Sequence, residues 1–173
     1  MDAYYKEQLE RTHRYYLRLK ALSEGVECRT SSEEYIDDMH AFFQNCYHIK
    51  DWLKNDPKYT AHTNAQIENY VTNSQSLSLC ADICNGAKHL FLSSKPRSKS
   101  AVKSLKTTKS MDWGAMIDFP EENSCPILTI NFKFEHNGKN IDALELAEDA
   151  MESWDSFTKC NITSHSKGLK IVG

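Results

Sequence analysis

The sequence predicts an α+β protein: a mainly α-helical bundle followed by a β-hairpin and a C-terminal helix. Apolar residues recur every three to four positions over most of residues 2–92, which is the helical period. They alternate at every second position over 113–119 and 128–135, and return to the helical period over 142–159. We expect residues 1–92 to form the bundle, 93–110 a basic Ser/Lys-rich loop, and 111–173 a hairpin and helix packed on the bundle as one domain.

Four helices are expected in the first half of the chain. The first covers about residues 2–23 and ends before Glu24-Gly25, a common stop signal. The second starts at Ser31 or Ser32 and runs to about residue 55, where Asp56-Pro57 ends it. The third covers about 64–73 and the fourth about 75–92. Because the connections are short, the simplest packing is an antiparallel bundle.

The segment 93–110 has a different composition from the helices before it. It is rich in serine, lacks acidic residues and carries the cations Lys95, Arg97, Lys99, Lys103, Lys106 and Lys109. So many unpaired charges do not bury, so the segment is expected to be a solvated linker or a flexible arm. The alternative is an arm that contacts nucleic-acid phosphates, which would make binding depend strongly on salt.

The C-terminal part is expected to contain two strands, a turn and a helix. Residues 120–126 would connect the two strands, and Asn137-Gly138 is typical of a tight turn. The helix over 142–159 would bury Ala143, Ala147, Ala150, Met151, Trp154 and Phe157. A short strand at 169–172 is also predicted.

Composition limits the classes of protein that fit. The charged fraction of 26% and hydrophobic fraction of 40% are those of a soluble globular protein, and the net charge of −3 argues against a chain-wide nucleic-acid footprint. No apolar run approaches the roughly 20 residues of a membrane span, and no signal peptide is visible, so we expect a cytoplasmic protein without a membrane partner. The sequence contains no motif for a cofactor and no paired Cys or His spacing typical of a metal site. Cys46, Cys80 and Cys84 lie on apolar stripes and are expected to be core thiols.

Two polar lines remain as candidate functional residues. Asp82, Asn85 and His89 follow one another at i, i+3 and i+7 along the fourth helix. Gln44, His48, Asp51 and Asn55 form a second line on the second helix. If the apolar stripes form the core, both lines face solvent. Alternatively, the outward faces of two subunits meet and enclose a polar cleft, in which a histidine could transfer protons.

The long second helix with HIKDW, followed by a helix carrying D-x2-N-x3-H, resembles the HEPN class of small helical-bundle proteins. In that class a polar residue and a histidine, typically Arg-x4-6-His, lie on one helix at a dimer seam. Many members cut RNA as toxins or defence effectors, and others are inactive binding or regulatory domains. The resemblance covers about residues 31–92 and leaves the segment from Trp113 onward unexplained.

The chain departs from that pattern because no arginine stands at the expected distance before His89. The resemblance therefore implies a catalytic role for His89 directly, and for Asn85 only by analogy. Asp82 would help to orient the imidazole, and Lys88 or the basic arm would contact the phosphate.

Two functions are therefore expected as alternatives. The first is a HEPN-like homodimer that binds RNA or cleaves it without a metal, in a bacterial or phage defence or toxin system. The second is a non-enzymatic protein-interaction module, such as an inhibitor, an adaptor or an antitoxin-like partner. Binding of a nucleotide or other small ligand in a bundle cleft is a third reading.

Overall fold

The computed structural model describes residues 3–23, 32–89, 95–98, 107–113 and 128–159. Within these ranges the side chains of residues 32, 33, 35, 87–89, 107–113 and 128–131 are not described. The elements in chain order are α1 (Tyr4–Ser23), α2 (Ser32–Asn55), α3 (Asn64–Asn73), α4 (Gln75–His89), β1 (Thr107–Trp113), β2 (Leu128–His136), β3 (Lys139–Asp142) and α5 (Ala143–Lys159). This confirms the predicted α+β class.

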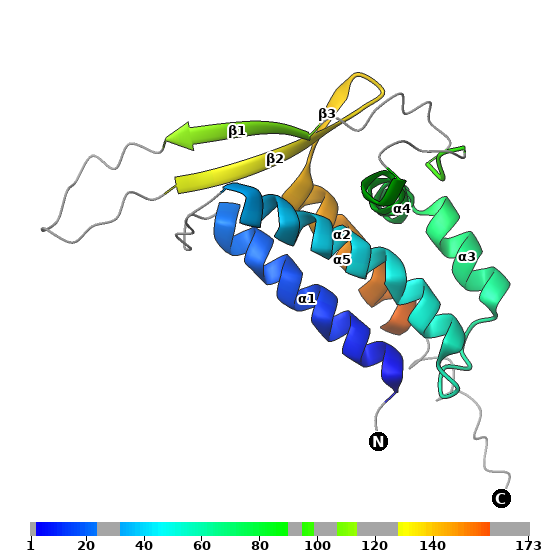
Figure 1. The fold of residues 1–173 in the computed structure, drawn as a ribbon. Helices are drawn as coiled ribbons and strands as arrows, with labels where there is room; N and C mark the ends of the chain where they lie inside the picture. The colour runs from blue at the N-terminus through cyan, green and yellow to red at the C-terminus, as the bar shows by residue number, and fades with distance from the viewer. Residues whose placement is uncertain (1–2, 24–31, 90–94, 99–106, 114–127, 160–173) are drawn as a thin grey trace, which may run out of the picture.

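The long helices α1, α2 and α5 lie side by side, and α5 contacts both of the others (Figure 1). The largest fully buried side chains of this core include Trp154 of α5 and Phe42 and Phe43 of α2. The Trp154 indole N–H donates to the carbonyl of Cys46, 3.1 Å away, so the one polar atom of this ring is satisfied. The C-terminal helix is thus part of the helical core. Of its six predicted inner residues only Met151 is not buried.

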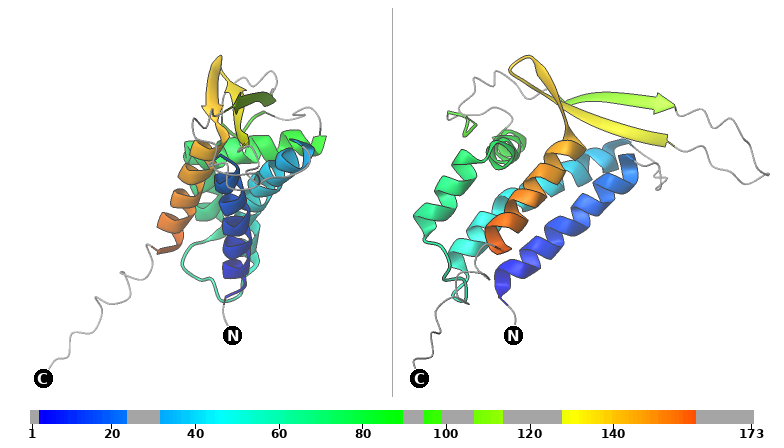
Figure 2. Two further views of the ribbon diagram at one scale, coloured as in Figure 1. Left: turned by 90° about the vertical axis from the view of Figure 1, so that its left-hand side faces the viewer. Right: turned by 180° about the vertical axis from the view of Figure 1, so that it is seen from behind.

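The prediction that the fourth helix runs antiparallel to its neighbours is wrong. In Figures 1 and 2, α4 runs across the direction of α1, α2 and α5. Every residue from Ser76 to Ile83 is buried, so these two turns have no solvated face. A helix that is enclosed on all sides has apolar or small residues all round, and Leu77, Leu79 and Ala81 fit that pattern.

The strands form a three-stranded antiparallel sheet in the order β1-β2-β3. Thr107 pairs with Phe134 and Trp113 with Leu128, while His136 pairs with Lys139 across the turn. Asn137 and Gly138 both have positive φ (52° and 72°), which is the conformation of a type I′ hairpin turn and confirms the predicted turn.

Two details of the sheet differ from the prediction. The first strand begins at Thr107, inside the segment expected to be a loop up to residue 110, and β3 was not expected at all. Residues 114–119 of the predicted first strand, its 120–126 connection and the predicted strand at 169–172 lie outside the described residues. On the helix side, Phe134 packs edge-on against Phe43 with ring centroids 5.3 Å apart. The sheet is thereby anchored to α2.

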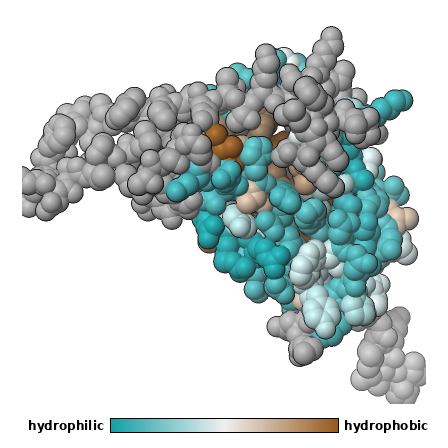
Figure 3. All heavy atoms as spheres, viewed as in Figure 1, coloured by the Kyte–Doolittle hydropathy of each residue, from teal (hydrophilic) through white to brown (hydrophobic). Residues whose placement is uncertain are grey.

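None of the helices in the described part of the chain combines the length and apolarity needed to cross a bilayer. Polar side chains cover most of the coloured surface in the view of Figure 3.

Candidate functional site

One residue of the polar line on α4, Asp82, is buried and hydrogen-bonded inside the protein. Asp82 is only 1% exposed, and its two carboxylate oxygens accept the backbone N–H groups of Arg97 and Ser98 at 2.7 and 3.1 Å. Asp82 therefore holds the segment 95–98 against α4 instead of facing solvent as the stripe pattern predicted. Asn85 is half-buried, and the side chains of Lys88 and His89 lie outside the described residues.

The basic arm is not uniformly solvated. Lys95 is exposed, but Arg97 is half-buried, and its guanidinium Nη2 lies 2.8 Å from Oε2 of Glu68 on α3. Lys109 belongs to β1, where its backbone pairs with Phe132. Lys99, Lys103 and Lys106 lie outside the described residues. The expectation of a solvated loop is thus wrong for Arg97, which contacts α3 and α4, and the expectation of a loop is wrong for residues 107–110, which belong to β1.

Arg97 joins an ionic network that links α2, α3 and the segment 95–98. The Lys54 ammonium lies 2.6 Å from Glu68 Oε1 and 3.0 Å from Asp51 Oδ1. The nearly buried Lys50 contacts the same two carboxylates at 3.1 and 2.9 Å. Each of the three cations thus has a carboxylate partner inside the protein, although the five charges together sum to +1.

The electrostatics of the network agree with this geometry. Burial raises the pKa of Glu68, but the hydrogen bonds from Lys54, Arg97 and Lys50 outweigh it and bring the pKa down to about 2. Asp51 behaves in the same way, since the bonds from Lys50 and Lys54 outweigh burial and lower its pKa. Of the second predicted polar line, Asp51 therefore belongs to the network, His48 is half-buried, and Gln44 and Asn55 are exposed.

The outer side of α5 shows the opposite arrangement. It carries five carboxylates, and its one cation, Lys159, pairs only with Asp155 at 2.5 Å. Tyr16 donates a hydrogen bond to Glu148 at 3.1 Å. Within the described part of the chain, Glu145, Asp149 and Glu152 have no ion pair. These three lie at i, i+4 and i+7, on one line of the helix.

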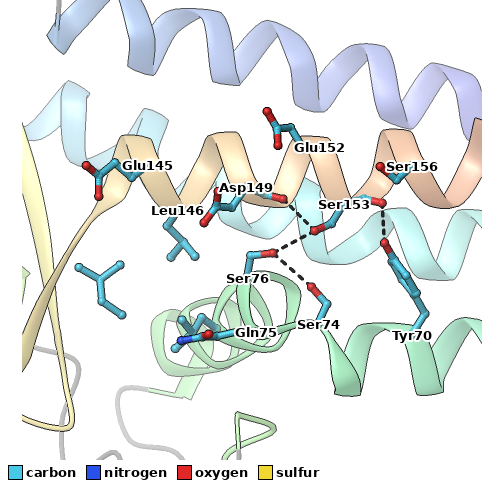
Figure 4. Close-up of a pocket in the computed structure, with 12 residues that line it drawn as sticks. Tyr70, Ser74, Gln75, Ser76, Glu145, Leu146, Asp149, Glu152, Ser153 and Ser156 are labelled. Atoms are coloured by element: carbon cyan, nitrogen blue, oxygen red, sulfur yellow. Dashed lines mark hydrogen bonds between the residues drawn. The ribbon is translucent and has the colours of Figure 1, made fainter.

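That line borders a groove between α5 on one side and α3, α4 and β3 on the other, with a volume of about 570 Å³ (Figure 4). We call it the α4–α5 groove. Its walls combine the three carboxylates with the hydroxyls of Tyr70, Ser74, Ser76, Ser153 and Ser156, and its apolar residues are Leu79, Ile141 and Leu146. The volume is in the usual range for a ligand site.

The hydroxyls along this groove form a directed chain. Ser153 donates to the carbonyl of Asp149 at 2.8 Å, so its 3.2 Å contact with Ser76 must use a proton from Ser76. By the same reasoning Ser74 donates to Ser76, also at 3.2 Å. Tyr70 donates to the carbonyl of Ser153 at 2.8 Å. Because these protons are used inside the protein, the hydroxyls of Tyr70, Ser74 and Ser153 present acceptors to the groove. Together with the three carboxylates, they are chemically complementary to a hydrogen-bond donor with positive charge.

Sequence reasoning missed the α5 carboxylates because it followed the apolar stripe of that helix and not the opposite face. The signal was present: acidic residues recur at 145, 148, 149, 152 and 155 with one cation in the helix. Acidic residues at these spacings repel one another, so they reduce helix stability.

The three cysteines within the described ranges offer no alternative site. Cys46 and Cys80 are buried free thiols, as predicted, and Cys84 is half-buried. Burial, together with the neighbouring thiols Cys46 and Cys84, raises the pKa of Cys80, which makes it a poor nucleophile. Among the residues that the structure describes, no three His, Cys, Asp or Glu side chains are grouped to hold a metal ion.

Comparisons of the chain with protein-family models, with curated proteins and with solved structures found no match. The chemistry of the groove is therefore the basis for a functional proposal.

Proposed function

We propose that this chain is a non-enzymatic protein-interaction module whose α4–α5 groove binds a lysine- or arginine-bearing segment of a partner protein. The observation that carries the proposal is the line of Glu145, Asp149 and Glu152, which has no ion pair among the residues that the structure describes and borders an acceptor-rich groove. Ammonium and guanidinium groups donate several hydrogen bonds and accept none, so they match this lining.

The cost of the acidic line also supports a binding role. Each like-charged pair at i, i+3 or i, i+4 reduces the stability of a helix by a few tenths of a kcal/mol. A protein partner that brings cations would relieve that repulsion, and association would be fast because the two surfaces attract at a distance.

The test is a binding titration with a fluorescein-labelled decalysine peptide, followed by fluorescence anisotropy. The variant Glu145→Gln/Asp149→Asn/Glu152→Gln is compared with Glu34→Gln/Asp37→Asn/Glu135→Gln, which changes the net charge equally at exposed positions outside the groove. We expect at least about tenfold weaker binding for the groove variant only. Equal loss in both variants would mean unspecific attraction and would overturn the proposal. Spermine is titrated in parallel, and binding of spermine without the peptide would replace the protein partner by a small polyamine.

The HEPN-like reading, an RNA-binding protein or metal-independent ribonuclease, remains as a second candidate because of one observation. An arginine from outside α4, Arg97, lies next to the polar line through the bond from its backbone N–H to Asp82, while its guanidinium pairs with Glu68. In this reading His89 is the acid or base, and Asn85 lies one turn before it. Labelled RNA incubated with the wild type and with His89→Ala tests it: the candidate requires cleavage that the variant loses. Equal cleavage, or none, would contradict the catalytic reading.

A further inference from the structure

A second groove, the α1–α5 groove, is lined by residues of α1 and α5. These two helices lie side by side in Figure 2, right. The volume of this groove is about 590 Å³. The half-buried side chains of Leu9, Tyr16 and Met151 give it an apolar floor. Carboxylates border it on both sides: Glu10 from α1, and Glu148, Glu152 and Asp155 from α5. The groove therefore fits an apolar side chain that is accompanied by a cation.

The outer face of α1 carries such a pair of residues. Leu17 is 49% exposed. Within the described ranges it is one of two large hydrophobic side chains with such high exposure. Arg14 lies one turn before it and has no ion pair within the described ranges. Arg18, on the other side, is already held by Asp38 at 3.4 Å and lies over the ring of Tyr15. Among the described residues, Arg14 is therefore the cation next to Leu17 for which no ion pair is seen.

Leu17 and Arg14 lie on the same helix, α1, that forms one wall of the groove. Glu10, His13, Arg14 and Leu17 follow at i, i+3, i+4 and i+7, so they lie on one face of α1. We propose that this face binds α1 of a second copy of the chain in antiparallel orientation, with the two-fold axis at the level of His13. Leu17 of each copy then reaches the floor near the partner's Leu9, and Arg14 reaches the partner's Glu10. A two-fold axis makes each contact twice, which is how self-complementary surfaces associate.

This interface differs from the dimer seam predicted on the fourth helix. The first turns of α4 are enclosed by the fold, and Asp82 is covered by residues 97 and 98. The α1 surface is open and carries both halves of the complementary contact. The two grooves share Glu152, but the other carboxylates of the α4–α5 groove, Glu145 and Asp149, are not part of the lining of the α1–α5 groove.

Sedimentation velocity of the full chain over a range of concentrations tests the inference. We expect a reversible monomer–dimer equilibrium that Leu17→Asp weakens at least about tenfold. Tyr4→Asp is the matched control, since Tyr4 is also 49% exposed and gains the same charge but lies in the first turn of α1, off the face that carries Glu10, His13, Arg14 and Leu17; it should leave the equilibrium unchanged. A wild type that stays monomeric at all concentrations, or a dimer that survives Leu17→Asp, would overturn the inference.

A charge exchange provides the second measurement. Glu10→Arg and Arg14→Glu should each weaken the dimer, because each places like charges opposite one another. The double variant Glu10→Arg/Arg14→Glu restores opposite charges in both copies and should regain the dimer. A folded double variant that remains as weak as the single variants would rule out the proposed docking. Far-UV circular dichroism checks the fold of each variant.

Discussion

Asp82 on α4 and Asp149 on α5 are both aspartates, but they differ in burial and in the partners of their carboxylates. Asp82 is buried, and both of its carboxylate oxygens accept hydrogen bonds from the backbone N–H groups of residues 97 and 98. Asp149 is exposed, faces a groove and has no cation among the described residues. The comparison teaches that a polar line on a helix identifies a functional surface only when the rest of the fold leaves its charges unsatisfied.

The largest effect is expected from removing the buried carboxylate. Asp82→Ala leaves two backbone N–H groups without an acceptor and should lower the free energy of unfolding by about 2–4 kcal/mol. Asp82→Asn keeps one acceptor and should have a smaller effect. Asp149→Ala is the control, and its change should stay within about 0.5 kcal/mol. Urea denaturation measures all three, and equal stability of the Asp82→Ala and Asp149→Ala variants would remove the distinction between the two helices.

A smaller effect is expected in the ionic network. Glu68→Gln removes the charge that Lys54, Arg97 and Lys50 share and should cost about 1–2 kcal/mol at pH 7, a value reduced for the partial exposure of this side chain. Because the pKa of Glu68 is lowered from 4.5 to about 2, its contribution is fully present above pH 4.5 and is lost as the pH falls through about 2.

Unfolding of wild type and Glu68→Gln at several pH values between about 7 and 2 separates this contribution from others. The stability difference between the two proteins should shrink as the solution is acidified. A difference that stays constant with pH would show that Glu68 acts through packing and not through its charge.

The smallest effect, with the opposite sign, is expected on α5. Glu145→Gln/Asp149→Asn/Glu152→Gln relieves repulsion between neighbouring turns and should raise the free energy of unfolding by about 0.5 kcal/mol at low salt. Added salt should reduce the gain, since it screens the repulsion in the wild type. Thermal unfolding at two salt concentrations measures this, and a destabilised variant would mean that the carboxylates support the fold.

Much of the fold could be predicted from the sequence because its signals are local. Apolar periodicity and the breaks at Glu24-Gly25 and Asp56-Pro57 located the first helices, and Asn137-Gly138 located the turn. The direction of α4 could not be predicted, because it depends on which side chains from distant segments enclose that helix. β1 was missed for a related reason: Thr107 and Lys109 enter the sheet through backbone hydrogen bonds to β2, which leave no apolar pattern in the segment.

The candidate site was less predictable than the fold. The contact between Asp82 and residue 97 joins positions 15 residues apart, and the Glu68 network joins α3 to both α2 and residue 97. Only these long-range contacts determine which carboxylates are paired inside the protein and which are not. The acidic line of α5 was visible in the sequence, but its groove depends on the packing of α4 across the bundle.

The most direct test of the central claim is a titration of ¹⁵N-labelled protein with decalysine, in which amide chemical shifts map the bound surface. The account predicts changes concentrated on α5 around Glu145, Asp149 and Glu152, and on the facing residues Ser74 and Ser76. Changes concentrated instead around Lys50, Lys54 and Arg97, or spread evenly over all acidic surfaces, would contradict it.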